Sequence, residues 1–271
     1  MELSYAFVVG LLFGSFLNVV ILRIPKDESV VFGASHCPTC KTPLKPWHNI
    51  PLFSWLFLRG KCAFCKTKIS PQYPLIEFLS ALIFTTLVYK YGISIPIFFV
   101  GMSFLMLLAL SMIDFRYKMV PDSLNLLAIL FAIFGAWSVQ GVIQNFQNAL
   151  LFAGGFTLLR FTLSYLLTSS VKKEAKKTQT PWTKHYHTYP YIEAMGEGDI
   201  MVGATMGALL GVPLALSAVF LSALLALPVM LALKDKSEEE QRVPFVPFLA
   251  LATFIVFIYD TQILNYIKAN Y

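Results

Sequence analysis

Residues 94–113 read SIPIFFVGMSFLMLLALSMI, a run of 20 residues without one charged side chain, and Asp114 closes it. A helix needs roughly 20 apolar residues to cross a hydrocarbon core of about 30 Å. This stretch therefore predicts a membrane-spanning helix that ends in a carboxylate.

The rest of the chain has the same character. Hydrophobic residues make up 57% of it and charged residues only 13%, and the mean hydropathy is +0.67. These values lie outside the range of soluble domains, so we expect an all-α polytopic membrane protein. About eight transmembrane helices are predicted, at residues 4–24, 74–91, 94–113, 122–138, 147–169, 199–215, 216–233 and 246–267, with the sixth and seventh split near Gly211.

The positive charges predict the orientation of these helices. Of 21 lysines and arginines, 18 lie at 23–68, 116–118, 172–184 and 234–242, which are alternate connections. Because lysine and arginine concentrate in cytoplasmic loops, we expect both termini outside and these connections inside. Topology thus accounts for the net charge of +6, and we expect membrane lipid but no nucleic acid among the partners. The first helix lacks a basic n-region and a small-residue cleavage site, so it is predicted to remain as an anchor.

The chain divides into a first transmembrane helix (1–24), a cytoplasmic loop (25–73) and a transmembrane bundle (74–271). Fewer than 50 loop residues cannot bury enough apolar surface to fold unaided. All four cysteines of the protein lie in this loop, as two C-x-x-C pairs: Cys37, Cys40, Cys62 and Cys65. That spacing is typical of a structural zinc site with four thiolates.

Two alternatives exist for this loop. The cysteine pairs could shuttle disulfides, but the charge pattern places them in the reducing cytoplasm, which favours zinc. His36 and His48 could also bind the metal, but four thiolates already satisfy it, so we interpret both histidines as loop residues.

Acidic residues within or beside membrane helices are costly and suggest function. Three of them have a structural explanation: Asp122 suits a helix N-cap, Glu77 lies in the first turns of a helix, and Asp260 lies near the outer interface. The other two are Asp114 and Asp199, and the topology places both at the same cytoplasmic depth.

Asp199 ends the sequence Gly196-Glu197-Gly198-Asp199, whose glycines allow a close approach of the backbone. Two carboxylates that share a site hold one proton between them, activate a water and protonate a departing amine. The pair therefore predicts an aspartic protease. For either residue alone, a helix cap or an ion pair is the alternative. Arg160 could pair with either aspartate or extend to the surface.

With these residues in order, the chain resembles the type IV prepilin peptidase family, whose second aspartate carries a G-x-G-D signature. The resemblance covers nearly the whole chain, through GSFLNVV (14–20) with Arg23 and Pro25, the four-cysteine loop, YPLIE (73–77), Asp114 with Pro121 and Asp122, GEGD (196–199), and VPFVPF (243–248).

The resemblance implies a bacterial inner-membrane enzyme that removes the basic leader of prepilins or pseudopilins on the cytoplasmic side. It implies that Asp114 and Asp199 are catalytic, with Gly196 and Gly198 forming the active-site backbone. It also implies that the four cysteines bind zinc, and that the enzyme methylates the new N-terminus with S-adenosylmethionine.

No G-x-G-x-x-G fingerprint predicts where a methyl donor would bind. Asn18, Arg23 and Glu77 lie at the membrane edge beside the cysteine loop and are candidate cofactor-binding residues, with helix capping and head-group contact as the alternative. The chain has Met201 where many relatives have lysine, and its loop 170–198 is long and rich in lysine, histidine and tyrosine. Two other functions remain open: a presenilin-like membrane aspartic protease, and a non-catalytic zinc-bearing assembly factor.

Overall fold

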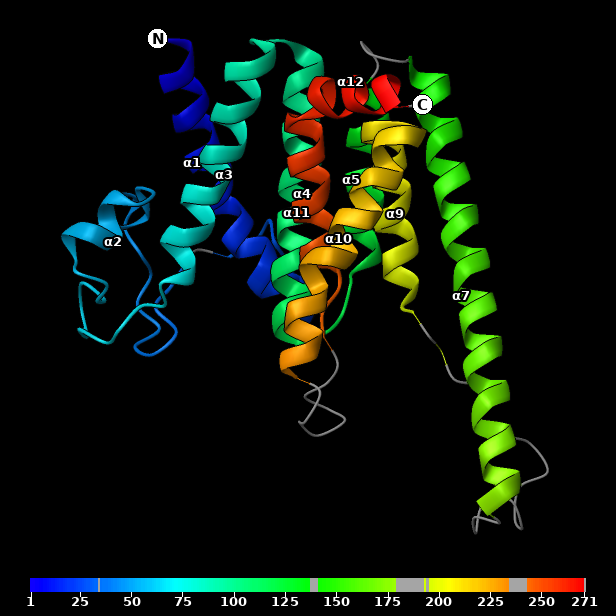
Figure 1. Ribbon diagram of the computed structural model, residues 1–271. Helices are drawn as coiled ribbons and strands as arrows, with labels where there is room; N and C mark the ends of the chain where they lie inside the picture. Colours follow the sequence, from blue (N-terminus) through cyan, green and yellow to red (C-terminus); the bar gives the residue numbers. More distant parts are fainter. Residues whose placement is uncertain (34, 137–140, 179–192, 194, 234–242, 271) are drawn as a thin grey trace.

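The computed structural model describes residues 1–33, 35–136, 141–178, 193, 195–233 and 243–270 (Figure 1). Within these residues the chain is helical and has only two isolated β-bridges, both in the cysteine loop. The long helices are α1 (Glu2–Arg23), α3 (Gln72–Tyr91), α4 (Ile95–Tyr117), α7 (Val142–Thr178) and α10 (Val212–Ala232). The shorter ones are α5 (Asp122–Gly135), α9 (Glu197–Leu210), α11 (Val246–Ile258) and α12 (Asp260–Asn270). The loop between α1 and α3 adds η1 (Ile24–Lys26), η2 (Pro46–Asn49) and α2 (Phe53–Phe57).

Each of the eight predicted segments coincides with a helix, which confirms the polytopic helical fold in outline. Among the described residues, however, five helices are long and apolar enough to cross a membrane, or up to six if the bent pair α11 and α12 is one span. The helices α5 and α9 have only 14 residues each, or about 21 Å of rise. The count of eight spans therefore remains a prediction.

Two boundaries differ from the sequence expectation. The helix predicted at 199–215 already ends at Leu210, because Gly211 has φ +71° and turns the chain directly into α10. The segment predicted at 246–267 is not one straight helix: α11 ends at Ile258, and α12 continues at an angle of 79°. Its polar sequence DTQILNYIKAN explains the change of direction, since this stretch is too hydrophilic to continue through lipid.

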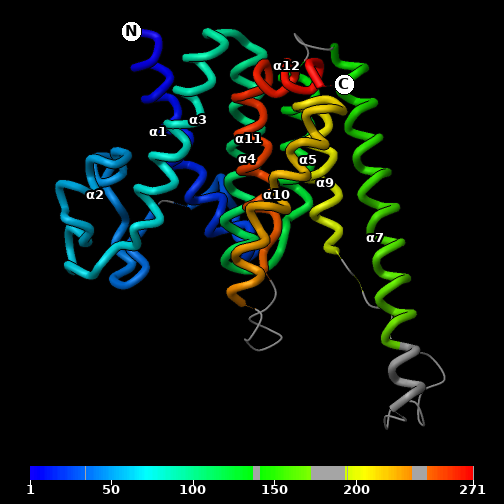
Figure 2. The backbone as a smooth tube through the Cα atoms, in the orientation of Figure 1, coloured from blue at the N-terminus to red at the C-terminus, as the bar shows by residue number. Residues whose placement is uncertain are grey.

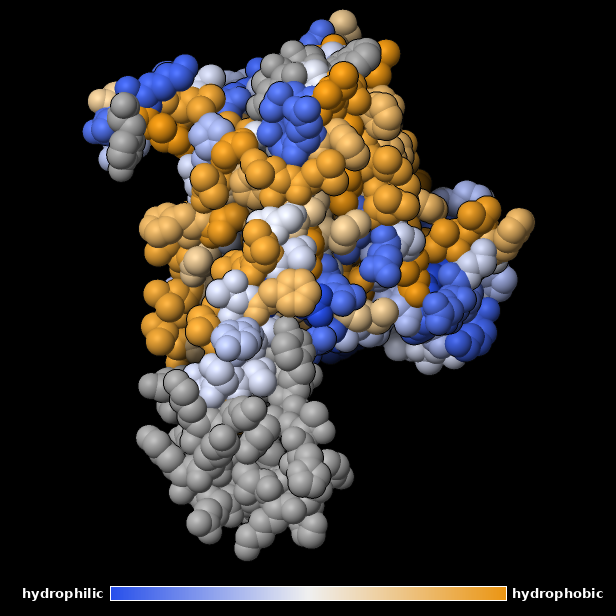
Figure 3. All heavy atoms as spheres, turned by 90° about the vertical axis from the view of Figure 1, so that its right-hand side faces the viewer, coloured by the Kyte–Doolittle hydropathy of each residue, from blue (hydrophilic) through white to orange (hydrophobic). Residues whose placement is uncertain are grey.

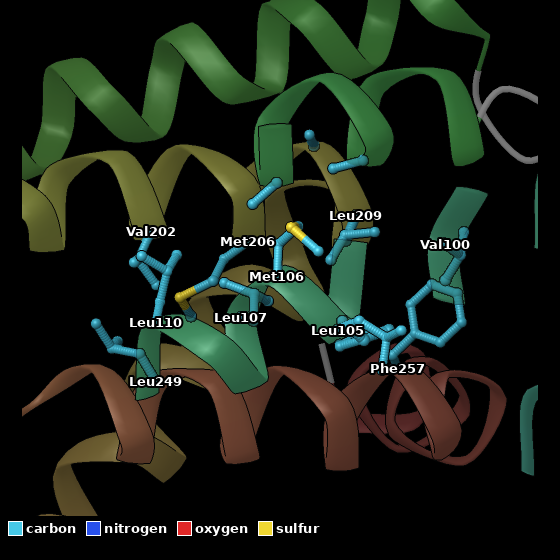
Figure 4. Close-up of a cluster of buried hydrophobic side chains, with 14 of the residues drawn as sticks. Val100, Leu105, Met106, Leu107, Leu110, Val202, Met206, Leu209, Leu249 and Phe257 are labelled. Carbon is cyan, nitrogen blue, oxygen red and sulfur yellow. The ribbon is translucent and has the colours of Figure 1, made fainter. Parts of the chain in front are cut away.

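The core of the bundle lies around α4, which packs against α5, α11, α3 and α1. Figure 4 shows side chains of α4, α9 and α11 meeting in this core. Leu107 and Leu110 of α4, Met206 of α9 and Leu249 of α11 are all at most 1% exposed. This shared core fixes the relative positions of the ends of α4, α9 and α11.

Glycines bring two helix pairs into close contact, because a missing side chain lets two backbones approach. A Cβ added to Gly10 of α1 would lie 2.5 Å from Ala81 Cα of α3. A Cβ added to Gly207 of α9 would lie 2.6 Å from the Asn148 oxygen of α7. The backbones of α1 and α3, and of α7 and α9, therefore pack almost directly on each other.

The tube in Figure 2 shows α1 and α3 with the cysteine loop on one side of the bundle and α7 on the opposite side. Both termini lie at the same end of the molecule, and the first turn of α9 lies toward the other end (Figure 1). Seen from the α7 side, hydrophobic side chains predominate over the upper part of the surface (Figure 3). This apolar surface fits a protein surrounded by lipid.

Candidate active site and four-cysteine site

Asp114 lies in the last turn of α4 and is only 8% exposed. Its Oδ2 accepts a hydrogen bond of 3.2 Å from the backbone N–H of Val246, the first residue of α11. The first N–H groups of a helix have no partner within it, and its N-terminus attracts negative charge. Asp114 therefore contacts the start of α11 and is also a candidate catalytic group. The sequence did not predict Val246 as its partner.

Asp199 is the third residue of α9, and Gly196 is the N-cap of that helix. The Asp199 side chain turns back toward Gly196: its Oδ2 lies 3.6 Å from the position of a Cβ added there. The third helical residue of a capping box takes this position, next to the backbone of the N-cap. The half-buried carboxylate is thus held at the start of α9.

Gly198 brings the two aspartates to one place. A Cβ added to Gly198 would lie 2.5 Å from Val120 Cβ, so only glycine lets the first turn of α9 lie against the turn between α4 and α5. The same turn follows Asp114 in the chain. The charges of Asp114 and Asp199 are close enough to interact. The structure thus joins the two aspartates that the sequence singled out, at the same end of the bundle.

Arg160 of α7 pairs with neither aspartate. Its Nη1 donates to Glu197 at 2.9 Å and its Nη2 to Glu193 at 3.1 Å. Glu197 belongs to the GEGD segment and Glu193 precedes it, and their side chains are 82% and 63% exposed. Ion pairs with partners this exposed are screened by water and contribute little to stability. Arg160 therefore tethers the approach to α9 weakly.

The remaining acidic candidates have structural roles. Asp122 is the first residue of α5, and Pro121 is its N-cap, so the predicted cap is wrong by one residue. Asp260 begins α12 and forms an ion pair of 2.5 Å with Lys90 of α3. Tyr91 also hydrogen-bonds to Asp260, at 3.2 Å. These contacts join α3 to the bend between α11 and α12.

The four cysteines come together in the loop. Their sulfur atoms all lie within 4.8 Å of one another, and Cys37 Sγ is 3.8 Å from Cys65 Sγ. A tetrahedral zinc with Zn–S bonds of about 2.3 Å has S···S edges of about 3.8 Å, whereas a disulfide bond measures about 2.05 Å. The residues therefore fit a metal ion.

The two cysteine pairs form the same turn twice. Cys37 N donates to Thr42 O at 3.1 Å, and Cys62 N donates to Thr67 O at 2.8 Å. We call these two turns the knuckles (residues 37–42 and 62–67). Hydrogen bonding with Thr67 lowers the pKa of Cys65 to about 6, and hydrogen bonding with Thr42 lowers the pKa of Cys40. Both shifts favour the thiolate, which is the form that binds metal.

The three candidate cofactor residues do not form one cluster of free groups. The Arg23 guanidinium donates to three carbonyl oxygens of its own loop, those of Ser29, Phe32 and Gly33. Asn18 is 1% exposed and donates to the Tyr73 carbonyl at 3.1 Å.

Glu77, the third of these residues, is 7% exposed and belongs to α3. Its Oε2 accepts a hydrogen bond of 2.8 Å from the backbone N–H of Leu52. Among the buried side-chain atoms of these three candidates, Asn18 Oδ1 has no hydrogen-bond partner within the described residues.

The fold and the site together define a polytopic membrane protein with a pair of neighbouring aspartates and a metal-type cysteine cluster. Residues 101–231 match the family described as "Type IV leader peptidase family", and residues 8–91 match the "Bacterial Peptidase A24 N-terminal domain". The chain belongs to the type IV leader peptidase family, and it is therefore an enzyme of the peptidase class rather than a non-catalytic factor.

Three relatives named "Prepilin leader peptidase/N-methyltransferase" illustrate the similarity. The protein of Neisseria gonorrhoeae is 33% identical, over 93% of this chain and 88% of its own length. That of Xanthomonas campestris pv. campestris is 31% identical, over 95% and 91%. That of Bacillus subtilis is 27% identical, over 98% of both chains. No solved structure matches the chain.

Proposed function

We propose that this protein cleaves the leader peptide of type IV prepilins or pseudopilins with Asp114 and Asp199, and that it methylates the new N-terminus. The observation that carries the proposal is the close contact of the first turn of α9, which bears Asp199, with the turn that follows Asp114, where the charges of the two carboxylates are close enough to interact. Relatives that align over nearly the whole chain carry both activities in their name.

The chemistry requires one proton shared by the pair. The ionised aspartate takes a proton from a water, which attacks the scissile carbonyl carbon, while the protonated aspartate donates a hydrogen bond to the carbonyl oxygen. Cleavage of the C–N bond then returns a proton to the departing amine. Asp114 and Asp199 supply both roles, and the α9 backbone keeps them in reach of one peptide bond.

The substrate side of the proposal rests on topology. Lysines and arginines of the sequence concentrate in alternate connections, including residues 116–118 shortly after Asp114, and the positive-inside rule supports a cytoplasmic position for the Asp114 end of the bundle. We therefore propose an inner-membrane protein whose termini face outward and whose active site faces the cytoplasm. A prepilin with a basic leader and a hydrophobic helix would present its cleavage site at this depth.

The four-cysteine loop is proposed to hold a structural zinc ion, bound by Cys37, Cys40, Cys62 and Cys65. Bound zinc would cross-link the two knuckles and so give the loop the fixed fold that its size cannot provide. For the methyl donor S-adenosylmethionine, Asn18, Arg23 and Glu77 remain the candidate residues. Asn18 Oδ1 is the unpaired acceptor among them.

The decisive experiment is mass spectrometry of the N-terminus of a prepilin co-expressed with the protein. Asp114→Asn and Asp199→Asn keep the size of each side chain and a hydrogen-bond acceptor but remove the carboxylate. We expect both to abolish cleavage, by at least about 10³-fold. Asp260→Asn, at the opposite end of the bundle, is the matched control and should retain cleavage. Cleavage by either active-site variant at the unsubstituted rate would refute the proposal.

A further inference from the structure

The cysteine loop exposes an unusual amount of apolar surface. Residues 46–57, which contain η2 and α2, connect the two knuckles, and we call them the apolar insert. Five of its large side chains are between 48% and 84% exposed: Trp47, Ile50, Phe53, Leu56 and Phe57. Contiguous exposed apolar surface of this kind marks a site of contact with another molecule or a membrane.

A hydrogen bond fixes the height of the apolar insert relative to the membrane. Leu52, the N-cap of α2, has the positive φ of +60° that residues other than glycine rarely adopt, and its N–H donates to Glu77 of α3. Glu77 lies five residues after Gln72, the first residue of α3. It is therefore about 7.5 Å up the helix from its loop end. The insert is thus attached to a level inside the span of α3, not below it.

The overall arrangement agrees with this level. In Figure 1, η2 and α2 lie beside the lower half of α3, and the knuckles lie below them. Figure 2 shows the same order along the backbone. The apolar insert therefore lies on the membrane side of the cysteine cluster, next to a helix that is surrounded by lipid.

The charged side chains of the cysteine loop are mostly basic. Residues 29–76 contain six lysines and arginines and no aspartate or glutamate. Lys45 and Arg59 flank the apolar insert, and Lys45 Nζ lies 5.3 Å from the centre of the Trp47 ring. Basic residues next to tryptophan and phenylalanine are typical of segments that lie in the interface of a membrane with anionic lipid.

We propose that the apolar insert enters the interface of the same bilayer that α3 crosses, with its apolar side chains among the acyl chains and its basic residues on anionic phospholipid head groups. Glu77 is a positioning residue that sets the depth of the insert through Leu52. The cysteine loop is then a part of the membrane-bound body rather than a separate soluble domain. This inference depends on α3 spanning the membrane and not on the proposed peptidase reaction.

The test uses the full-length protein in vesicles of phosphatidylcholine and phosphatidylglycerol, with and without bromine on the acyl chains. Brominated chains quench tryptophan that lies among them. Phe57→Trp places a probe on the insert, and Lys68→Trp places one at an exposed position directly after the second knuckle. The emission of the unsubstituted protein in the same vesicles is subtracted. We expect quenching of the Phe57→Trp probe to be at least about twofold stronger than that of Lys68→Trp.

Equal quenching of the two probes would overturn the proposal, because the insert would then face water, a second copy of the chain or another protein.

The role of Glu77 is tested by adding Glu77→Ala to Phe57→Trp. The quenching should fall, while Glu77→Gln, which keeps an oxygen acceptor for Leu52, should preserve it. Undiminished quenching with Glu77→Ala would remove Glu77 as the positioning residue. Unchanged thermal unfolding of each variant in detergent shows that the bundle is intact.

Discussion

The four-cysteine site and the aspartate pair are built in opposite ways. Each knuckle closes within six residues by the same backbone hydrogen bond, from Cys37 to Thr42 and from Cys62 to Thr67. The aspartates come instead from α4 and α9, and they meet because Gly198 contacts Val120. The first site is a property of two short sequences, whereas the second is a property of the packed bundle.

The two sites should therefore lose their structure or activity in response to different changes. A knuckle has little core of its own, so we expect its fold to depend on the proposed zinc ion. The aspartate pair is held by buried helices and should survive most surface changes, but a misplacement of about 1 Å at a reacting group can cost on the order of 10²-fold in rate. The loop should therefore respond to loss of a ligand, and the pair to loss of a contact.

The largest effect is expected at the cysteines. Cys62→Ser removes one of four ligands, and structural zinc sites contribute on the order of 10 kcal/mol to folding. We expect the purified variant to lose its zinc and to be cut by protease within residues 29–70, while the helical bundle stays intact. Metal analysis and limited proteolysis measure both.

Lys61→Ser, at the neighbouring position, is the control and should keep the metal. A chelator added to the unsubstituted protein should reproduce the cleavage pattern of Cys62→Ser. If instead the unsubstituted protein contains no zinc and its cysteines form a reversible disulfide, the redox interpretation of the loop is correct.

A smaller effect is expected at Gly198. Gly198→Ala places a methyl group 2.5 Å from Val120 Cβ, so α9 must shift away from the turn after Asp114. We expect prepilin cleavage to fall about 10²-fold, which is about 3 kcal/mol in transition-state stabilisation. The added variant Val120→Gly removes the opposing Cβ and should restore much of the rate.

Gly155→Ala is the matched control, because a Cβ at Gly155 of α7 meets no atom within 4 Å. Wild-type cleavage by Gly198→Ala would show that the contact between α9 and the turn does not position the aspartates. Failure of Val120→Gly to rescue would point to a different role for Gly198.

The sequence predicted what depends on periodicity and on short motifs. All eight apolar segments form helices, the chain turns at Gly211, and the four cysteines gather in one cluster. Each of these features follows from composition, spacing or the missing side chain of glycine. Each feature can be predicted from the residues that form it, without knowledge of contacts to distant segments.

What the sequence could not predict depends on contacts between distant segments. The bond from Val246 to Asp114, the pairing of Arg160 with two glutamates and the link from Leu52 to Glu77 each join segments more than 20 residues apart. No spacing rule connects such positions. Only the family resemblance singles out the VPFVPF segment, and Val246 within it is a partner of Asp114.

The smallest effect separates the two roles of Asp114. Asp114→Ala removes the acceptor for Val246 N–H as well as the carboxylate, whereas Asp114→Asn keeps an amide oxygen at the start of α11. Losing a helix-capping acceptor costs about 1–2 kcal/mol. Both variants should therefore be inactive, but only Asp114→Ala should unfold at a measurably lower temperature in detergent.

Differential scanning calorimetry with a prepilin cleavage assay distinguishes these outcomes. Equal unfolding temperatures for Asp114→Ala and Asp114→Asn would mean that the bond to Val246 adds nothing to stability. Asp114 differs from the cysteines in this respect: we expect a cysteine to hold its loop together through a bound ion, whereas Asp114 contacts the start of α11 directly and is at the same time a candidate catalytic group. The contact with Val246 keeps its carboxylate at a fixed place in the bundle, and such a fixed place is what a shared proton between two aspartates requires.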